Sequence, residues 1–311
     1  MTEFNHYTVM KQEAVDALKC QNGKIYVDCT LGGGGHSELI LQRISPDGRL
    51  IAFDIDDDAI AFASERLKNY NNLTIVKSSY TNIKQVCSDL GIKKITGGVL
   101  FDLGTSYHQL TKQERGFSFT KEAPLDMRFN QEQDFCAYDV INTYSEDDLV
   151  RIFSEYGEEH FSKRIAKEII NKRKLKSINT TTELSELITR CTPAVKSKIH
   201  PATRVFQALR IEVNHELQNV KDTLTNILDL LEFGAIISVI SFHSLEDRIV
   251  KQIFKYYSTR CHCDKTQMIC KCPPPILELV NKKPITASEE EIKLNPPSRS
   301  AKLRIAKCIR K

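Results

Sequence analysis

The stretch VDCTLGGGGHSELIL, from Val27 to Leu41, places four consecutive glycines between an apolar run and the start of an amphipathic segment. The apolar run, residues 24–30, predicts a buried strand, and residues 36–44 predict a helix. A glycine-rich turn between a strand and a helix lets main chain approach a ligand closely and directs the helix N-terminus toward it. The stretch therefore predicts the ligand-binding corner of an α/β fold.

The same alternation of strand and helix continues outward from this corner. Short apolar runs predict strands, and segments with apolar residues at helical spacing predict helices. The further predicted strands are residues 48–56, 73–79, 97–104, 234–242 and 300–309, and the further predicted helices are residues 57–70, 81–91 and 244–257. Alternation at this spacing implies right-handed crossovers and a parallel, doubly wound sheet.

The alternation of predicted strands and helices ends after Leu110. Residues 111–209 contain no convincing strand and carry helical patterns instead. The simplest organisation is one discontinuous domain, residues 1–110 and 213–311, interrupted by a helical insertion at residues 111–212. The predicted fold class is therefore α/β, a Rossmann-like domain with a mostly parallel sheet and an all-helical insertion domain.

Composition narrows the class of protein. The chain has 311 residues, of which 41% are hydrophobic, and this is enough for a substantial core. No apolar run approaches the roughly 20 residues that a bilayer requires, and the N-terminus lacks the basic-then-apolar order of a signal peptide. We therefore expect a soluble, cytoplasmic protein with no membrane partner, whose ten cysteines are reduced.

Charge is distributed unevenly along the chain. Residues 132–159 carry nine acidic side chains and one arginine, residues 160–210 carry twelve Lys or Arg and three Glu, and residues 293–311 carry seven basic side chains and no acid. Clustered positive charge of this kind is expected of a protein that binds a polyanion. The alternative is a solvated helical face with no partner.

Three carboxylates follow predicted strands. Asp28 ends the first strand, Asp54 ends the second, 22 residues after Gly32, and Asp102 ends the fourth. An acid in the position of the second can accept hydrogen bonds from both ribose hydroxyls of a nucleoside. Each acid alone has a helix cap or a turn as its alternative, but their occurrence on several strand ends favours binding. With the glycine turn they predict a nucleoside-cofactor pocket, in which Tyr80 stacks on the base or packs in the core.

Two classes of cofactor share this geometry. Pyrophosphate cofactors such as NAD favour the spacing Gly-x-Gly-x-x-Gly. The run DCTLGGG, from Asp28 to Gly34, is instead similar to the acidic-x-Gly-x-Gly-x-Gly motif of S-adenosylmethionine-dependent methyltransferases, with Thr30 at the first glycine position. The ammonium of a sulfonium amino acid suits an acid beside the turn, whereas three acids along one sheet edge would repel a diphosphate. We therefore favour S-adenosylmethionine, with Asp28 and Gly32 among its contacts.

Segments spread along nearly the whole chain resemble the bacterial ribosomal RNA small-subunit methyltransferase H family, also called MraW. Members of this family methylate the exocyclic N4 amine of a cytidine in the decoding region. The segments that carry the resemblance are HYTVMKQEAV, DCTLGGGGHS, RGFSF (Arg115 to Phe119), PLDMR (Pro124 to Arg128), HPATRVFQALRIEVNHEL (His200 to Leu217), SFHSLEDRIVK (Ser241 to Lys251) and RSAKLR (Arg299 to Arg304). The resemblance implies the same activity, with small-subunit ribosomal RNA or an assembling small subunit as the partner.

The resemblance also implies positions for the cofactor contacts. They fall on Gly34, Gly35, His36, Asp54, Tyr80, Asp102 and Gln109. The loop after Asp102 departs from the family pattern, because Tyr107 and His108 replace Ser-Pro. Pro297 stands where an arginine is common, which removes one expected phosphate contact.

The predicted chemistry requires help for a weak nucleophile, because the lone pair of cytosine N4 is delocalised into the ring. A hydrogen-bond acceptor on the amine would favour a pyramidal nitrogen and take up developing positive charge. Asp102 is the predicted catalytic residue. His243, after the fifth predicted strand, is a second candidate that could bond the pyrimidine, and its alternative is a structural cap.

Basic and aromatic side chains supply candidate RNA contacts. Arginines in the insertion and basic residues of the C-terminal segment would bind phosphates, and two phenylalanines would stack on a splayed-out base. The alternative for the phenylalanines is burial between domains. The candidate RNA-binding residues are Arg115, Phe117, Phe119, Arg128, Arg204, Arg210, Arg299 and Lys302.

Cys261, Cys263, Cys270 and Cys272 form a compact group. Four thiolates so close together suggest a structural zinc, although the usual knuckle has the spacing Cys-x-x-Cys. The alternative is a cysteine-rich surface hairpin that binds no metal.

Two other functions are compatible with parts of this pattern. A nicotinamide-dependent oxidoreductase would bind NAD and not S-adenosylmethionine. A non-catalytic RNA-binding assembly factor would bind RNA with a steep salt dependence and transfer no methyl group. The sequence leaves open whether the protein forms a homodimer and whether free RNA or a subunit is the substrate.

Overall fold

The computed structural model describes residues 8–105, 112–193, 200–263 and 270–311. The chain divides into two compact units. The sheet unit comprises Met1–Gly104 and Leu217–Lys311, and the insertion unit comprises Thr105–Glu216. The sequence placed the corresponding boundaries at residues 110 and 213.

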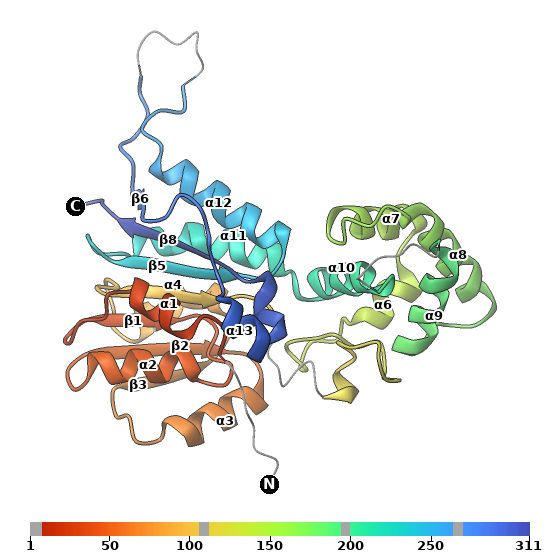
Figure 1. The fold of residues 1–311 in the computed structure, drawn as a ribbon, viewed down its shortest axis with the longest axis horizontal. Coiled ribbons are helices and arrows are strands. Elements are labelled where there is room, and N and C mark those ends of the chain that lie inside the picture. The colour runs from red at the N-terminus through yellow and green to blue at the C-terminus, as the bar shows by residue number, and fades with distance from the viewer. Residues whose placement is uncertain (1–7, 106–111, 194–199, 264–269) are drawn as a thin grey trace. The chain divides into compact units, whose positions relative to one another are not determined.

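Five parallel strands form the centre of the sheet unit (Figure 1). The sheet has the order β3-β2-β1-β4-β5-β8-β6, so the chain moves outward from β1 to β3 and then returns to place β4 on the other side of β1. The predicted fold class, a mostly parallel doubly wound sheet, is confirmed. The parallel strands are β1 (Ile25–Asp28), β2 (Arg49–Asp54), β3 (Leu73–Lys77), β4 (Gly98–Asp102) and β5 (Ile236–Ser241).

Antiparallel strands extend the sheet at its β5 edge. β8 (Lys302–Cys308) pairs antiparallel with β5, and the short strands β6 (Leu277–Leu279) and β7 (Ile285–Thr286) both pair with β8. Because β8 follows β5 only after a long connection, the C-terminal segment completes the sheet.

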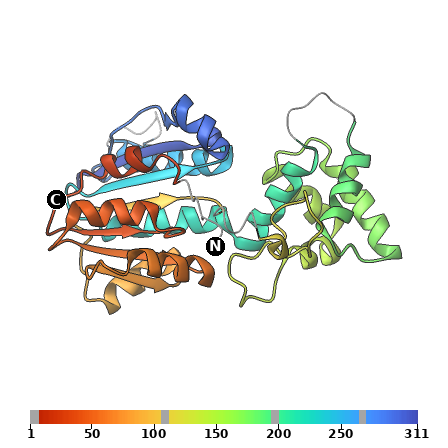
Figure 2. The ribbon, with the colours of Figure 1, turned by 60° about the horizontal axis from the view of Figure 1, so that its bottom comes forward.

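Helices cover both faces of the sheet (Figure 2). Alternate strand residues point to opposite faces, so the apolar residues of each strand divide between two separate cores. One core packs against α1 (Lys11–Ala17), α2 (Gly35–Ile44), α3 (Asp57–Leu67) and α13 (Glu289–Leu294), and the other against α4 (Ile83–Asp89), α11 (Glu216–Asn226) and α12 (Ser244–Ser258). Short 3₁₀ turns are η1 (Tyr80–Asn82), η3 (Ile227–Asp229) and η4 (Pro296–Ser300).

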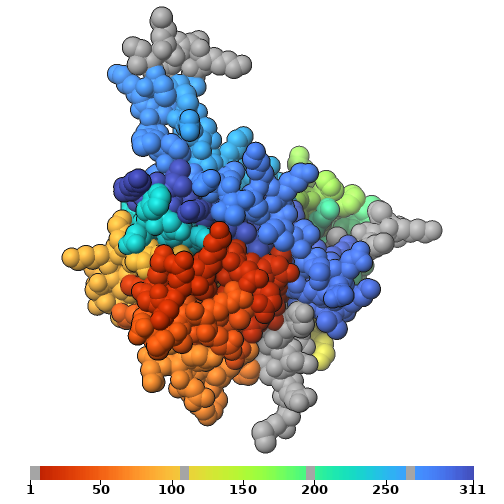
Figure 3. Space-filling view, turned by 60° about the vertical axis from the view of Figure 1, so that its left-hand side comes forward, coloured from red at the N-terminus to blue at the C-terminus, as the bar shows by residue number. Residues whose placement is uncertain are grey.

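Between α12 and β6 the chain extends away from the sheet as an arm, of which residues 259–263 and 270–276 are described (Figures 1 and 3). Residues 264–269 of the arm lie outside the described residues. The backbone N–H of Ile276 donates to the carbonyl of Tyr257 at 2.9 Å and closes the base of the arm.

The insertion unit is helical and has its own apolar core. Helix α10 packs against α6, α7 and α9. In the described part of this unit the only strand-like pairing is the isolated bridge between Pro124 and Thr180. Its elements are η2 (Gln113–Arg115), α6 (Ala137–Thr143), α7 (Glu146–Glu155), α8 (Ser162–Leu175), α9 (Thr181–Cys191) and α10 (Ala202–Asn214).

Within the described residues, no helix combines the length and the apolar character that crossing a membrane requires.

Phe153 tests whether the insertion unit depends on its own core. The Phe153 side chain is 0% exposed, so Phe153→Ala should lower the free energy of unfolding by about 3–5 kcal/mol. Leu175→Ala is the matched control, since Leu175 is 87% exposed and its loss should change stability by less than about 0.5 kcal/mol. Urea unfolding measures both variants, and equal effects would contradict the assignment of this core.

Candidate functional site

Three acids meet at the carboxyl edge of the sheet. Asp28, Asp54 and Asp102 are the last residues of β1, β2 and β4, which are adjacent strands. The edge between β1 and β4 is the topological switch point, where open α/β sheets bind their ligands. The structure therefore brings the predicted carboxylates to one place on the sheet unit.

Asp54 fastens the glycine turn to β2. Its Oδ2 accepts the N–H of Gly32 at 2.8 Å, and its Oδ1 accepts the N–H groups of Ile55 and Asp56 at 2.8 and 2.9 Å. Burial raises the pKa of Asp54 despite these hydrogen bonds. Each carboxylate oxygen has two lone pairs, so Oδ2 can still accept a hydroxyl from a ligand.

Asp28 joins the end of β1 to the start of α2. The carboxylate is fully buried, and it accepts the hydroxyl of Ser37 at 2.7 Å and the N–H of Thr30 at 3.0 Å. Burial is the main reason that the pKa of Asp28 is raised to about 6, and nearby Asp54 raises it further. Sequence reasoning missed Ser37 and Thr30, although Thr30 occupies a motif position usually taken by glycine.

Asp102 has the least satisfied carboxylate of the three. Its side chain is 23% exposed, yet Oδ1 is enclosed and has no hydrogen-bond partner among the described residues. Its backbone N–H donates to the Thr30 hydroxyl at 2.7 Å. Burial raises its pKa well above the ordinary value, with further contributions from Asp28, Glu246 and Glu291. A buried polar atom without a partner is a feature that a ligand can satisfy.

His36 lies against the same carboxylate. Its Nε2 is 3.1 Å from the backbone carbonyl of Val9, and because a carbonyl only accepts, Nε2 is the donor. Its Nδ1 is 3.7 Å from Asp102 Oδ2. The imidazole is therefore held in a fixed orientation, with its second nitrogen directed at the acid.

Side chains of the protein itself pack closely against two glycines of the turn. A Cβ on Gly35 would lie 1.8 Å from Thr8 Oγ1, and a Cβ on Gly34 would lie 3.2 Å from Leu67 Cδ1. Gly34 and Gly32 also have positive φ angles of 76° and 48°. At Gly34 and Gly35 the protein itself thus fills the space beside the bare backbone, and the cofactor contacts of these two glycines stay predictions. Gly32 alone of these three has open space around its missing side chain, with nothing closer than 3.9 Å.

Tyr80 and the loop after β4 supply the remaining predicted cofactor contacts. Tyr80 begins η1, and its ring lies edge-on to Phe101 with centroids 5.7 Å apart. The Tyr80 ring is partly buried against the core. This position is compatible both with packing in the core and with stacking on the base of a cofactor. Gln109, with Tyr107 and His108, lies outside the described residues.

His243 is the N-cap residue of α12. The N–H groups of Phe242 and His243 donate to Glu246 Oε2 at 2.8 and 3.3 Å, and His243 Nε2 is 3.1 Å from Glu246 Oε1. Glu246 thus supplies the acidic half of a capping box, whereas neither ring nitrogen of His243 has a hydrogen-bond partner among the described residues. Glu246 is 1% exposed and was not identified from the sequence. The position of His243 matches its structural alternative, and contact with a base stays a prediction.

Arg115 is enclosed within the insertion unit. It is 3% exposed, and its guanidinium donates to the backbone carbonyls of Arg128 and Phe129 at 3.0 and 3.2 Å. A guanidinium that is buried on internal carbonyls is not available to an RNA phosphate. The phosphate contact predicted for Arg115 is therefore not supported, and its role is to hold this loop.

Two other predicted arginines are paired with carboxylates. Arg128 donates to both oxygens of Asp126 at 2.9 and 2.7 Å, and Arg210 donates to both oxygens of Glu216 at 2.8 and 2.9 Å. A phosphate would have to compete with these bidentate pairs. Contacts of Arg128 and Arg210 with RNA stay predictions.

The aromatic candidates differ in accessibility. Phe117 is buried in the core of the insertion unit and stacks on Phe129 with centroids 5.5 Å apart. It packs within this one unit, and its contact with a base stays a prediction. Phe119 is partly buried, stacks on exposed His200 at 4.7 Å and meets Phe206 edge-on at 4.9 Å. Phe119 and His200 thus form an aromatic pair at the surface of this unit.

The other basic candidates lie at the surface of their own units. Arg204 is half-exposed on α10, and Arg299 is exposed in η4. Lys302 begins β8, with its Nζ 3.6 Å from Asp247 Oδ2. The contacts of these three residues with RNA stay predictions.

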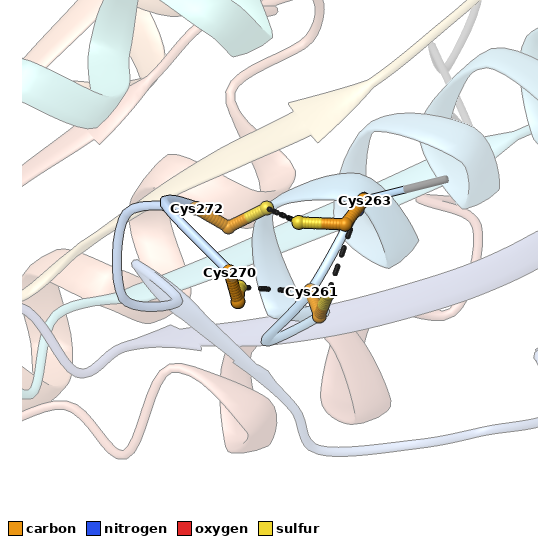
Figure 4. Close-up of side chains that lie close together, drawn as sticks. All are labelled: Cys261, Cys263, Cys270 and Cys272. Carbon is orange, nitrogen blue, oxygen red and sulfur yellow. Dashed lines mark hydrogen bonds between the residues drawn. The ribbon is translucent and has the colours of Figure 1, made fainter. Parts of the chain in front are cut away.

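The four cysteines of the arm converge, as Figure 4 shows.

Comparison with known proteins gives the family. The sequence matches the model of the MraW methylase family over residues 3–309. This chain belongs to the MraW methylase family. A family member named ribosomal RNA small subunit methyltransferase H, from Caldicellulosiruptor bescii, is 50% identical over 98% of this chain and 100% of that protein. Another protein with the same name, from Clostridium botulinum (strain Loch Maree / Type A3), is 47% identical over 99% of this chain and 100% of that protein.

The comparison confirms the resemblance that the sequence motifs gave for the MraW family. Among solved structures, an rRNA methylase from Streptococcus thermophilus aligns with a TM-score of 0.43 and 10% identity, covering 96% of this chain and 95% of that one. At that distance the alignment says nothing further about activity. Membership of a methylase family favours methyl transfer over the nicotinamide-dependent alternative.

Asp28 gives a pH-dependent prediction for this site. Its pKa is about 6 in the folded protein against an ordinary 3.8, so the folded state binds the proton more tightly than the unfolded state. Its ionisation therefore costs stability as pH rises from about 4 to about 6, and the cost is complete above that range. Asp28→Asn removes the titration, and the Ser37 hydroxyl can reverse to accept from the amide. Relative to the native chain, this variant should gain up to about 3 kcal/mol between about pH 4 and 7.

Urea unfolding of both proteins at stepped pH measures this difference. A difference in the free energy of unfolding that stays constant across the range would show that Asp28 is ionised at low pH, contrary to the effect of its burial.

Proposed function

We propose that this chain transfers a methyl group from S-adenosylmethionine to the exocyclic N4 amine of a cytidine in small-subunit ribosomal RNA. The observation that carries the proposal is the enclosed Oδ1 of Asp102, at the switch point of the sheet beside the glycine turn, which has no hydrogen-bond partner among the residues that the structure describes. Membership of a methylase family and the names of relatives nearly half identical to this chain support it.

The residues at the strand ends fit this cofactor. Oδ2 of Asp54 keeps a lone pair for a ribose hydroxyl while it holds the Gly32 N–H. Gly32 offers main chain with open space around it. Asp28 keeps a lone pair for the ammonium group, and the buried carboxylates together favour a cationic ligand over a diphosphate. The family's further contacts are proposed for Gly34, Gly35, His36, Tyr80 and Gln109.

The protein's part in the chemistry is to position and activate the amine. When bound, the cofactor supplies a methyl group on a positively charged sulfur. Asp102 accepts a hydrogen bond from the N4 amine, which favours a pyramidal nitrogen and stabilises the positive charge that develops on it. The amine loses one proton as the new N–C bond forms, and Asp102, whose pKa is raised, is suited to receive it. His36, whose ring is fixed by the Val9 carbonyl, lies with Nδ1 3.7 Å from the other oxygen of this carboxylate.

Each unit offers a separate surface for RNA. The insertion unit presents Arg204 and the aromatic pair of Phe119 and His200, which suit a phosphate and an unstacked base. The sheet unit presents Arg299 and Lys302 near its C-terminus. Basic groups at the surface bind phosphates regardless of sequence, so the choice of cytidine depends on the pocket.

Asp102→Asn tests the catalytic assignment. The native protein should bind S-adenosylhomocysteine in calorimetry and should restore N4-methylcytidine, read by nucleoside mass spectrometry, to small subunits from cells that lack the gene. The variant should lower the single-turnover rate about 10²–10³-fold, because an amide cannot take the proton. The native rate should rise with pH through the elevated pKa of Asp102, and the variant should lose that dependence.

Asp57→Asn is the matched control, since its carboxylate lies on the exposed surface of α3; it should leave binding and rate unchanged. Binding of NAD in place of S-adenosylhomocysteine would overturn the cofactor assignment. RNA binding without any methyl transfer would identify the protein as an assembly factor instead.

Arg299→Ala tests the electrostatic contact of the C-terminal segment with RNA. If the exposed guanidinium neutralises one phosphate, the slope of log K against log salt should fall in magnitude by about 1. Filter binding of small-subunit RNA across a salt series measures the slope. Lys68→Ala is the control, since Lys68 is exposed but paired with Glu65 on α3, and a slope unchanged in both variants would remove Arg299 from the interface.

A further inference from the structure

Four thiols converge in the arm that follows α12 (Figure 4). The Sγ atoms of Cys261, Cys263, Cys270 and Cys272 all lie within 4.8 Å of one another. Cys263 and Cys272 are 3.5 Å apart at sulfur, and Cys261 and Cys270 are 3.6 Å apart. All four are free thiols. Each pair joins one side of the arm to the other.

These sulfur separations match a single tetrahedral ion. Zinc–sulfur bonds of about 2.3 Å at tetrahedral angles place ligand sulfurs about 3.8 Å apart. Disulfides would instead join sulfurs about 2.05 Å apart and would pair them in two separate bonds. A cluster of two irons would divide the thiolates between two centres, whereas here all four surround one point. The spacing Cys-x-Cys departs from the usual knuckle, yet it delivers four sulfurs to that point.

Backbone donors are already directed at these sulfurs. The N–H of Cys263 is 3.4 Å from Cys261 Sγ, and the N–H of His262 is 3.1 Å from Cys272 Sγ. Such N–H groups stabilise the thiolate, which is the form that binds metal, and they orient the ligands. The His262 ring stacks on Tyr256 of α12 with centroids 4.2 Å apart, which ties the cluster to the helix end.

The described part of the arm has no apolar core to hold it. Among the described residues from 260 to 274, none is buried. The arm also stands away from the body of the sheet unit (Figure 3). A short segment that cannot bury an apolar core requires a cross-link or a metal to hold one conformation. The four thiols are the group in the described part of the arm whose ligand atoms converge closely enough to supply one.

We propose that Cys261, Cys263, Cys270 and Cys272 bind one structural Zn²⁺ ion that fixes the arm. Thiolates are the soft ligands that zinc prefers, and four protein ligands leave no open position for catalysis. Helix α12 has 15 residues and therefore separates the cluster from His243 by about 22 Å. The ion thus has a structural role that is distinct from methyl transfer.

Metal analysis of the full chain, with its affinity tag removed, tests the proposal. The protein is reduced, supplied with zinc, desalted and analysed by plasma mass spectrometry. We expect about one zinc per chain in the native protein and less than about a tenth in the double variant Cys261→Ser, Cys272→Ser. Cys20→Ser, outside the arm, is the matched control and should retain the full equivalent.

A second measurement follows the arm itself. Chelation should raise trypsin cleavage at Arg260 and Lys271 by on the order of tenfold in the native protein, because the arm opens when the ion leaves, and zinc should restore protection. Retention of less than half an equivalent after reconstitution, iron in place of zinc, or two disulfides in the reduced and repurified chain would each overturn the proposal. Chelation that leaves cleavage unchanged would overturn the structural role.

Discussion

Three carboxylates share one poorly hydrated edge of the sheet, and the glycine turn makes this possible because it brings hydrogen-bond donors to them. Asp54 accepts a hydrogen bond from the Gly32 N–H, and Asp28 accepts hydrogen bonds from the Thr30 N–H and the Ser37 hydroxyl. Without these donors the acids would destabilise the fold through burial and mutual repulsion. Of these three carboxylates, only that of Asp102 has an enclosed oxygen with no partner among the described residues. The edge is therefore suited to a cationic or donor-bearing ligand.

The sequence predicted the centre of this fold well because buried parallel strands carry a strong local signal. Each of β1 to β5 is mostly apolar, and the acids that end β1, β2 and β4 come together because parallel strands end at one edge. β6 and β7 contain only three and two residues, which is too short for a periodic pattern. The domain boundary near residue 110 differs from Gly104 because a connecting loop carries no periodicity that marks its ends.

The parts of the site that sequence reasoning missed depend on contacts between distant residues. Thr8 packs against Gly35, so this glycine is required by the N-terminal segment. Arg115 shows that the same limit applies to charged residues. A local count of basic residues cannot reveal that its guanidinium donates to internal backbone carbonyls. Residue type predicted where positive charge is concentrated. Only the tertiary structure shows which cations are already neutralised.

The discontinuous sheet unit has a consequence for the order of folding during synthesis. β4 is complete at Asp102, but its neighbour β5 begins at Ile236, and β8 follows only at Lys302. While the intervening helices emerge from the ribosome, one side of β4 has no partner and presents unpaired backbone groups. The insertion, with its own core, can fold during this interval. The nascent chain must therefore protect an exposed sheet edge from aggregation until β5 and β8 have been translated.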